Sequence, residues 1–297
     1  MKIGVLYNCQ AEGIALSLAA LLPGTEVVHY TVASMPRTEQ ARQEVAEVLR
    51  ACDHVVAARL SPEHGPLATN ALRRTVRRLQ VMPALRFRAF HPDSMYVRWP
   101  DGKFVGGPTG DYQSRIGVIG YLAGLSVEET TSFYNRMVFQ RLGYLAGFAP
   151  ECALFSEILT SHGMDAATLL PQWLAQGCFM HSMNHPKITV LFEVARAACA
   201  QMGLGPVNPA ASAADVPDRL ATMPIHPVFP AIAKNAGVPP EGTFRAGLRA
   251  DRPASLSLEE FLAASFAEYA GVPRELLLAS DGVVEGLATL GLKEGRK

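Results

Sequence analysis

The first 93 residues alternate short apolar runs with stretches whose apolar positions have helical spacing. Each strand-like run ends at turn-forming or polar residues, and a helical pattern follows. The expected strands cover residues 2–7, 25–32, 53–58 and 84–90, and the expected helices cover 14–22, 38–49 and 68–79. This βαβαβαβ order is typical of a doubly wound parallel sheet, so the predicted fold class is α/β with three layers.

Helical periodicity dominates between residues 111 and 203. We expect this part to form a mainly helical addition to the sheet, so that residues 1–203 make one α/β domain. Its longest helix is predicted at 187–202, after His185 and Pro186. Proline suits the first helical position, which leaves His185 or Asn184 as the N-cap.

The last third of the chain has weaker patterns. After residue 203 the sequence is rich in Pro, Gly and Ala, and only 257–270 and 273–278 have clear helical signals. We predict that residues 204–297 form an extension packed on the same domain.

Charge and cysteine content narrow the classes of function. The 297 residues include 27 Lys and Arg against 27 Asp and Glu. This balance argues against a nucleic-acid or acidic-membrane partner, which needs a basic excess. Five dispersed cysteines without a CxxC pair favour a reducing compartment. With neither a signal-peptide pattern nor an apolar run of about 18 residues, the expected protein is cytoplasmic and has no membrane span.

Three short polar motifs follow predicted strands or precede a predicted helix. They are Asn8-Cys9-Gln10, His91-Pro92-Asp93 and Asn184-His185-Pro186. Because parallel strands end at the same edge of a sheet, the first two motifs are expected at one edge, and a helix N-terminus can face it. Convergence of Cys9, Gln10, His91 and His185 is therefore a geometric prediction.

Cys9 differs from the other cysteines because it lies in a polar strand-to-helix turn. A helix N-terminus lowers the pKa of a nearby thiol, so we expect an available thiolate. The others are interpreted as small buried apolar residues: Cys52, Cys152, Cys178 and Cys199. His91 and His185 each precede proline, and either could instead satisfy backbone groups.

Other site types are disfavoured. His181 and His185 are four residues apart, but the helix starts too late to place both on one face and no HExxH glutamate is present, so no metal is expected. The run Arg73, Arg74, Arg77 and Arg78 is read as a solvated face, with phosphate binding as the alternative. The sequence has no GxGxxG after its first strand, no P-loop and no GxSxG motif.

The motifs resemble those of the WcbI-type polysaccharide-biosynthesis acetyltransferase family. The similarity runs over about residues 2–202 and depends on Asn8-Cys9-Gln10, His91-Pro92-Asp93 and Met183-Asn184-His185-Pro186. It implies a sheet like that of SGNH-type esterases, with cysteine in place of serine. It also implies a link to capsular polysaccharide synthesis and coenzyme A as a co-substrate.

Residues and resemblance together predict O-acetyl transfer from acetyl-CoA to a sugar or polysaccharide-precursor hydroxyl. Cys9 is the expected nucleophile, with His185 as first and His91 as second choice of base. Four residues are expected to stabilise the oxyanion or to orient the catalytic groups: Asn8, Gln10, Asp93 and Asn184. The candidate cofactor-binding residues are His181, Arg73 and Arg77. An SGNH-like esterase and a non-catalytic sugar- or nucleotide-binding protein remain alternatives, and a homo-oligomer stays open.

Overall fold

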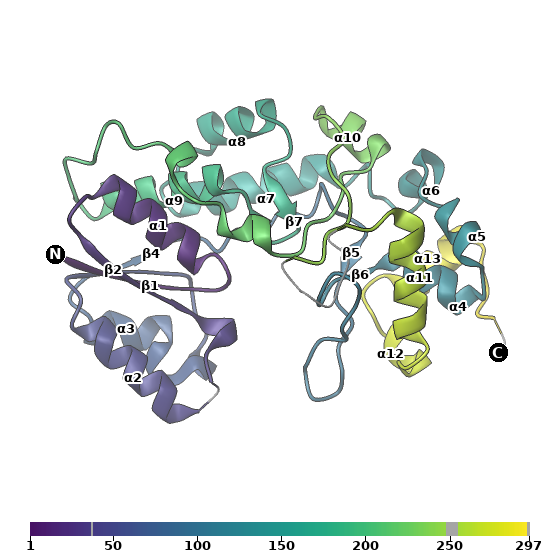
Figure 1. The fold of residues 1–297 in the computed structure, drawn as a ribbon, viewed down its shortest axis with the longest axis horizontal. Helices are drawn as coiled ribbons and strands as arrows, with labels where there is room; N and C mark the ends of the chain where they lie inside the picture. Colours follow the sequence, from purple (N-terminus) through teal and green to yellow (C-terminus); the bar gives the residue numbers. More distant parts are fainter. Residues whose placement is uncertain (37, 248–254, 296–297) are drawn as a thin grey trace. The chain divides into compact units, whose positions relative to one another are not determined.

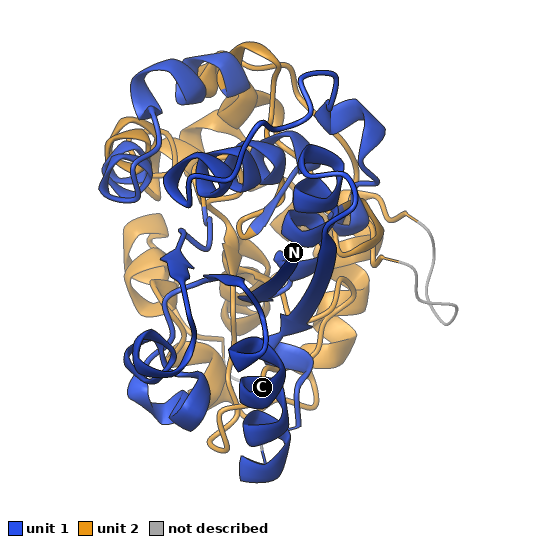
Figure 2. Ribbon diagram, turned by 90° about the vertical axis from the view of Figure 1, so that its left-hand side faces the viewer, with its two compact units in different colours: residues 1–86, 154–173, 185–220 blue, residues 87–153, 174–184, 221–297 orange. Residues whose placement is uncertain are grey.

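A computed structural model describes residues 1–36, 38–247 and 255–295, which fall into two compact units (Figure 2). Unit 1 consists of Met1–Arg86, Leu154–Trp173 and His185–Leu220. Unit 2 consists of Phe87–Ala153, Leu174–Asn184 and Ala221–Lys297. Both units contain residues from before and after position 203. The predicted division into a domain of residues 1–203 and an extension of residues 204–297 stays a prediction.

Unit 1 is built on a parallel sheet, as predicted. Its strands are β1 (Lys2–Tyr7), β2 (Glu26–Thr31), β3 (His54–Ala57) and β4 (Leu79–Val81). Their order is β2-β1-β3-β4, and every neighbouring pair is parallel. This is the order of the first four strands in flavodoxin-like folds, so the α/β fold class is confirmed.

Helices cover both faces of this sheet (Figure 1). The covering helices are α1 (Ala11–Leu21), α2 (Glu39–Arg50), α3 (Thr69–Thr75) and α9 (Ile188–Gln201), with short 3-10 turns at η1 (Val32–Ser34), η2 (Pro62–Leu67) and η3 (Ala213–Asp215). Leu6 on β1 packs with Leu49 of α2, and by alternation Tyr7 faces the opposite side. On that side α1 packs on α9, and the absence of a side chain at Gly13 permits the close approach. A Cβ at this position would lie 2.5 Å from Leu191 Cδ1.

Unit 2 is mainly helical. It contains a two-stranded antiparallel ladder of β5 (Ser94–Met95) and β6 (Gln113–Ser114), and it also contains β7 (Met180–Ser182). Its helices are α4 (Arg115–Ala123), α5 (Val127–Thr131), α6 (Arg136–Arg141), α10 (Pro230–Ala236), α11 (Leu258–Tyr269), α12 (Arg274–Leu278) and α13 (Val283–Leu290). A core of α4, α11, α12 and α13 side chains includes Val118, Leu122, Tyr269 and Leu277.

The remaining elements lie near the boundaries of the units. Helices α7 (Phe148–Ser161) and α8 (Ala166–Ala175) and the turn η4 (Arg219–Thr222) each contribute residues to both units, and β8 (His185–Pro186) belongs to unit 1. Among the described residues, no helix combines the length and the apolar character that a bilayer span requires.

The predicted fourth strand at 84–90 is wrong. The strand is β4 at Leu79–Val81, and residues 84–90 follow it without a ladder. Phe87 and Phe90 are buried because they pack on each other and on Phe179 in unit 2, with ring centroids 4.9–5.1 Å apart. The apolar alternation that predicted a strand therefore reflects residues buried in an aromatic cluster.

The start of the long helix also differs from the prediction. His185 and Pro186 form β8, and Lys187 is the N-cap of α9. The carboxylate of Asp218 accepts a hydrogen bond from the Ile188 backbone N–H at 3.1 Å. A distant side chain thus takes over the capping that was expected from His185 or Asn184.

Candidate functional site

The turn between β1 and α1 holds Cys9 at the carboxyl edge of the parallel sheet. Asn8 Oδ1 accepts from the Gln10 backbone N–H at 3.0 Å, and Asn8 O accepts from the Ala11 N–H at 3.1 Å. These bonds form a turn of the type that asparagine favours. Cys9 lies in the middle of it, half-buried and unpaired with any other cysteine.

Gln10 fixes this turn to the chain that follows β4. Its carboxamide is fully buried, donates from Nε2 to Leu85 O at 2.7 Å, and accepts from the Leu85 N–H at 3.1 Å through Oε1. Both ends of the carboxamide thus replace a missing strand partner for Leu85. The Gln10 side chain therefore positions this turn, and its predicted oxyanion role stays a prediction.

Replacing Gln10 by alanine is expected to lower the free energy of unfolding by about 2–6 kcal/mol. The change leaves the buried N–H and carbonyl of Leu85 without acceptor and donor, at about 1–3 kcal/mol each. Urea unfolding measures the effect, and Gln40→Ala on the exposed face of α2 is the control. A loss below about 1 kcal/mol would show that water replaces the carboxamide.

The pKa of the Cys9 thiol is not lowered as predicted. Burial raises it to about 11, and the hydrogen bond from the cysteine's own backbone N–H opposes this only in part. Helix α1 begins two residues later, at Ala11. The lost solvation of the thiolate therefore outweighs the helix dipole, and the thiol keeps its proton at neutral pH.

The predicted partners of Cys9 are divided between the units. His185 belongs to unit 1 with Cys9, and only 3% of its surface is exposed. His91, Asp93 and Asn184 belong to unit 2. Their convergence with Cys9 stays a prediction.

Asp93 lies before the start of α4, and its predicted role in orienting a histidine stays a prediction. Its Oδ1 accepts from the Ile116 backbone N–H at 2.9 Å and from the Tyr144 hydroxyl at 3.0 Å, and its Oδ2 accepts from the Tyr134 hydroxyl at 3.2 Å. Burial raises the pKa of the carboxyl group, while hydrogen bonds from Ser114, Ile116 and Tyr144 and the charge of Arg115 oppose the rise. Asp93 thus anchors the start of α4.

Asn184 and His181 are the two other predicted site residues that lie in unit 2, and both form hydrogen bonds. The Asn184 carboxamide accepts from the Tyr112 hydroxyl at 2.5 Å and donates to the Tyr96 hydroxyl at 3.3 Å. The carbonyl of His181 in β7 accepts from the His226 N–H at 2.9 Å. The predicted roles of Asn184 in orientation and of His181 in cofactor binding stay predictions.

His226 is a polar residue that the sequence reasoning missed. Its Nδ1 lies 3.0 Å from Ser94 Oγ, its Nε2 lies 3.0 Å from Thr109 Oγ1, and its carbonyl oxygen lies 3.1 Å from His91 Nε2. The sequence carries a signal for it, because His226-Pro227 repeats the His-Pro pair seen at residues 91 and 185.

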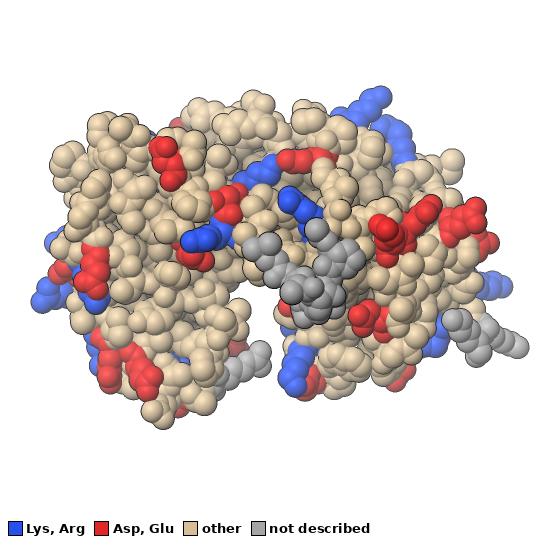
Figure 3. Space-filling view, viewed as in Figure 1, with Lys and Arg blue, Asp and Glu red and all other residues tan. Residues whose placement is uncertain are grey.

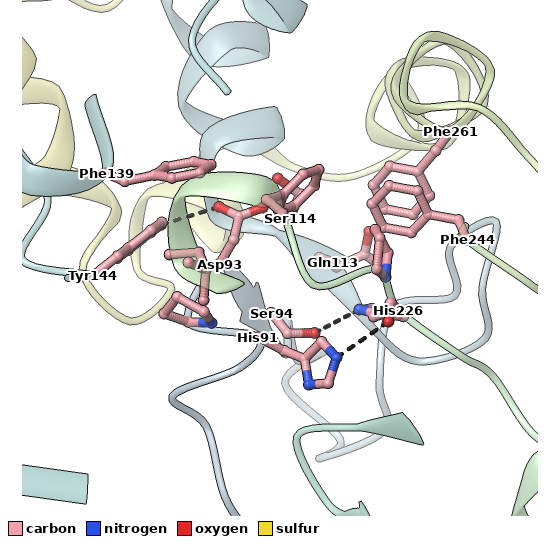
Figure 4. A pocket seen from close by; sticks show the side chains of 14 residues that line it. His91, Asp93, Ser94, Gln113, Ser114, Phe139, Tyr144, His226, Phe244 and Phe261 are labelled. Carbon is pink, nitrogen blue, oxygen red and sulfur yellow. Dashed lines mark hydrogen bonds between the residues drawn. The ribbon is translucent and has the colours of Figure 1, made fainter. Parts of the chain in front are cut away.

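His91, Ser94 and His226 line a small cavity of unit 2 (Figure 4). Figure 4 shows His91, Ser94 and His226 on one side of it and Asp93 with Tyr144 on the other, with the stacked rings of Phe244 and Phe261 nearby. The space that the centre of a water molecule can occupy is about 20 Å³. That is room for about one water and too little for a coenzyme.

A larger pocket of about 440 Å³ lies in unit 1 at the carboxyl edge of the sheet. The segments after β2 and β3 form it, and these strands flank β1 on its two sides. Its polar side chains are Arg42, Glu63 and His64, and Arg42 Nη1 donates to Glu63 O at 2.8 Å. A guanidinium and an imidazole at this edge suit an anionic ligand.

Arg73 and Arg77 lie at the other edge of the sheet. Arg77 pairs with Asp53 at 3.3 Å, and Asp53 directly precedes β3 and accepts from the Lys2 N–H at the start of β1. Arg73 is exposed in the last turn of α3, which leads back to the amino end of β4. The predicted role of Arg73 and Arg77 in cofactor binding stays a prediction. On the face that Figure 3 shows, acidic and basic side chains are interspersed.

Comparisons with known proteins give two matches. The sequence model of the family described as polysaccharide biosynthesis enzyme WcbI matches residues 2–207. A solved structure of WcbI, described as a novel polysaccharide biosynthesis enzyme in its native form without a disulfide bond between coenzyme A and a cysteine, is similar with a TM-score of 0.72. The identity is 14%, over 97% of this chain and 94% of that chain. No curated protein matches the sequence.

Proposed function

Because this chain belongs to the family of the polysaccharide biosynthesis enzyme WcbI, we propose that it transfers an acetyl group from acetyl-CoA to a sugar hydroxyl in polysaccharide synthesis. The match over residues 2–207 confirms the resemblance drawn from the sequence motifs. The observation that carries the finer proposal is the position of Cys9, held by two hydrogen-bonded neighbours at the ligand-binding edge of a parallel sheet.

In this proposal the Cys9 sulfur attacks the thioester carbonyl of acetyl-CoA. The new bond joins Cys9 Sγ to the acetyl carbon, and the bond from that carbon to the sulfur of coenzyme A breaks. The oxygen of a sugar hydroxyl then bonds to the acetyl carbon, the bond from that carbon to Cys9 Sγ breaks, and the hydroxyl proton passes through the base to the sulfur, which re-forms the Cys9 thiol.

A pKa of about 11 means that Cys9 needs a base at neutral pH. His185 is our first candidate because it belongs to the same unit, and His91 is the second. The base takes the Cys9 proton and passes it to the departing thiolate of coenzyme A. The Ala11 N–H already donates to Asn8 O, so the N–H groups of Glu12 and Gly13 in the first turn of α1 are the proposed donors to the oxyanion.

Coenzyme A is proposed to use the unit 1 pocket that contains Arg42 and His64. The pocket opens at the same sheet edge as Cys9, and Arg42 can offer N–H groups beyond the one bonded to Glu63. The solved WcbI structure supports the proposal, since its description mentions coenzyme A together with a cysteine, although it is the form without a disulfide bond between them.

The test combines a thermal shift with intact-protein mass spectrometry. We expect coenzyme A to raise the melting temperature, and acetyl-CoA to leave an acetyl group on the peptide containing Cys9. Arg42→Gln should weaken the shift, whereas Arg77→Gln at the opposite edge should not. No shift at millimolar coenzyme A would contradict the proposal, and hydrolysis of p-nitrophenyl acetate independent of coenzyme A would indicate an esterase.

A further inference from the structure

A second pocket of unit 2 contains two arginines from different parts of the chain. It measures about 240 Å³ and is lined by Arg88, Arg115 and Glu151 around a floor that includes Pro92 and Tyr144. Arg115 is the first residue of α4, whereas Arg88 lies in the segment after β4. Two guanidinium groups at one small pocket are a common arrangement for recognising an oxyanion.

The Arg115 guanidinium is held in place but is not saturated with acceptors. It lies over the ring of Tyr144, with Cζ 5.7 Å from the centroid, and against Gly282, where a Cβ would come within 2.9 Å of Cζ. Its Nε is buried, and no acceptor among the described residues bonds to it. Because the Nε has no accessible surface, a ligand oxygen would bind through the Nη groups of Arg115, whose side chain is 16% exposed.

Asp281 is the carboxylate that faces both arginines, and it binds neither closely. Its Oδ2 lies 3.8 Å from Arg88 Nη1 and 3.9 Å from Arg115 Nη2, beyond hydrogen-bond distance. Its side chain is 73% exposed. Such loose, solvated pairs contribute little stability, so an incoming anion can displace this carboxylate at low cost.

Glu151 is the acidic residue that lines the pocket itself, and its carboxylate already accepts a hydrogen bond. Its Oε1 accepts from the Arg88 backbone N–H at 2.7 Å. This bond partly offsets the repulsion that Glu151 exerts on an anion in the pocket.

We propose that the Arg88–Arg115 pocket binds the oxyanion of a small ligand, either a phosphate monoester or a carboxylate. Asp281 acts as an internal counter-ion that the ligand displaces. The proposal concerns unit 2 alone and does not depend on acetyl transfer by Cys9.

Calorimetric titration of the full chain tests the proposal with inorganic phosphate, glucose 6-phosphate, glucuronate and uncharged glucose. We expect at least one anion to bind and glucose not to bind, and the ranking of the anions identifies the source of the oxyanion. Arg115→Gln should weaken binding at least tenfold. Asp281→Asn should tighten it about two- to fivefold, because it removes a competing charge.

Two further variants keep the result decisive. Arg115→Lys retains the charge without the fork of N–H groups, and we expect weaker binding from a folded protein, as judged by circular dichroism. Asp101→Asn removes an exposed carboxylate that pairs with Lys103 instead, and should leave the affinity unchanged. The proposal is overturned if no anion binds at millimolar concentration, if Arg115→Lys binds as the wild type does, or if Asp101→Asn tightens binding as much as Asp281→Asn.

Discussion

Cys9→Ala is expected to lower acetyl-CoA turnover at least about 10³-fold, which corresponds to about 4 kcal/mol of lost transition-state stabilisation. Alanine cannot form the proposed acetyl intermediate. It is also apolar and small, so the bonds of Asn8 and Gln10 that shape the turn should persist. Initial rates of coenzyme A release, measured with the acceptor at saturation, give the effect.

Cys152→Ala is the matched control for this measurement. Cys152 is also half-buried and unpaired, and burial also raises its pKa, but it lies on α7 in unit 2. Its replacement should leave turnover within about twofold of the wild type. If Cys9→Ala retained a tenth of the activity or more, the nucleophile role would be lost and direct transfer from the coenzyme would be preferred.

The sheet of unit 1 could be predicted because its signals are local. Strand alternation and helical spacing placed β1, β2 and β3 within one residue at each end, and the turn at Cys9 followed from them. β4 was missed because Leu85 and Phe87 alternate as a strand would. Their burial comes instead from the Gln10 carboxamide and from an aromatic cluster.

The chemistry of the polar residues depends on partners far away in the sequence. Gln10 bonds to a residue 75 positions later, and Asp93 bonds to tyrosines 41 and 51 positions later. No spacing rule connects such pairs. The pKa of Cys9 was mispredicted for a related reason, since the helix start is visible in the sequence and the burial that outweighs it is not.

Asp93→Leu is expected to lower the free energy of unfolding of the chain by about 3–5 kcal/mol. Leucine has a similar size but leaves the Ile116 N–H and the Tyr144 hydroxyl without their acceptor, whereas the Tyr134 hydroxyl keeps Ser114 Oγ as a partner. Each buried donor left unsatisfied costs about 1–3 kcal/mol. Urea unfolding at pH 7 measures the loss, and Asp111→Leu at an exposed position is the control.

The pH dependence of Asp93→Asn separates the burial of the carboxyl group from its hydrogen bonds. Because burial raises the pKa of Asp93 above 3.8, the folded state binds the proton more tightly than the unfolded state. The group therefore stabilises the fold most below pH 3.8, and this contribution is lost as the pH rises through the raised pKa.

Asparagine does not titrate, and the contributions of the other carboxyl groups cancel when the wild type and Asp93→Asn are compared. The stability of the wild type relative to Asp93→Asn should thus decrease from pH 3.5 to pH 7. An increase over that range would mean that the hydrogen bonds from Ser114, Ile116 and Tyr144 and the charge of Arg115 together outweigh the lost solvation, so that the folded-state pKa of Asp93 lies below 3.8.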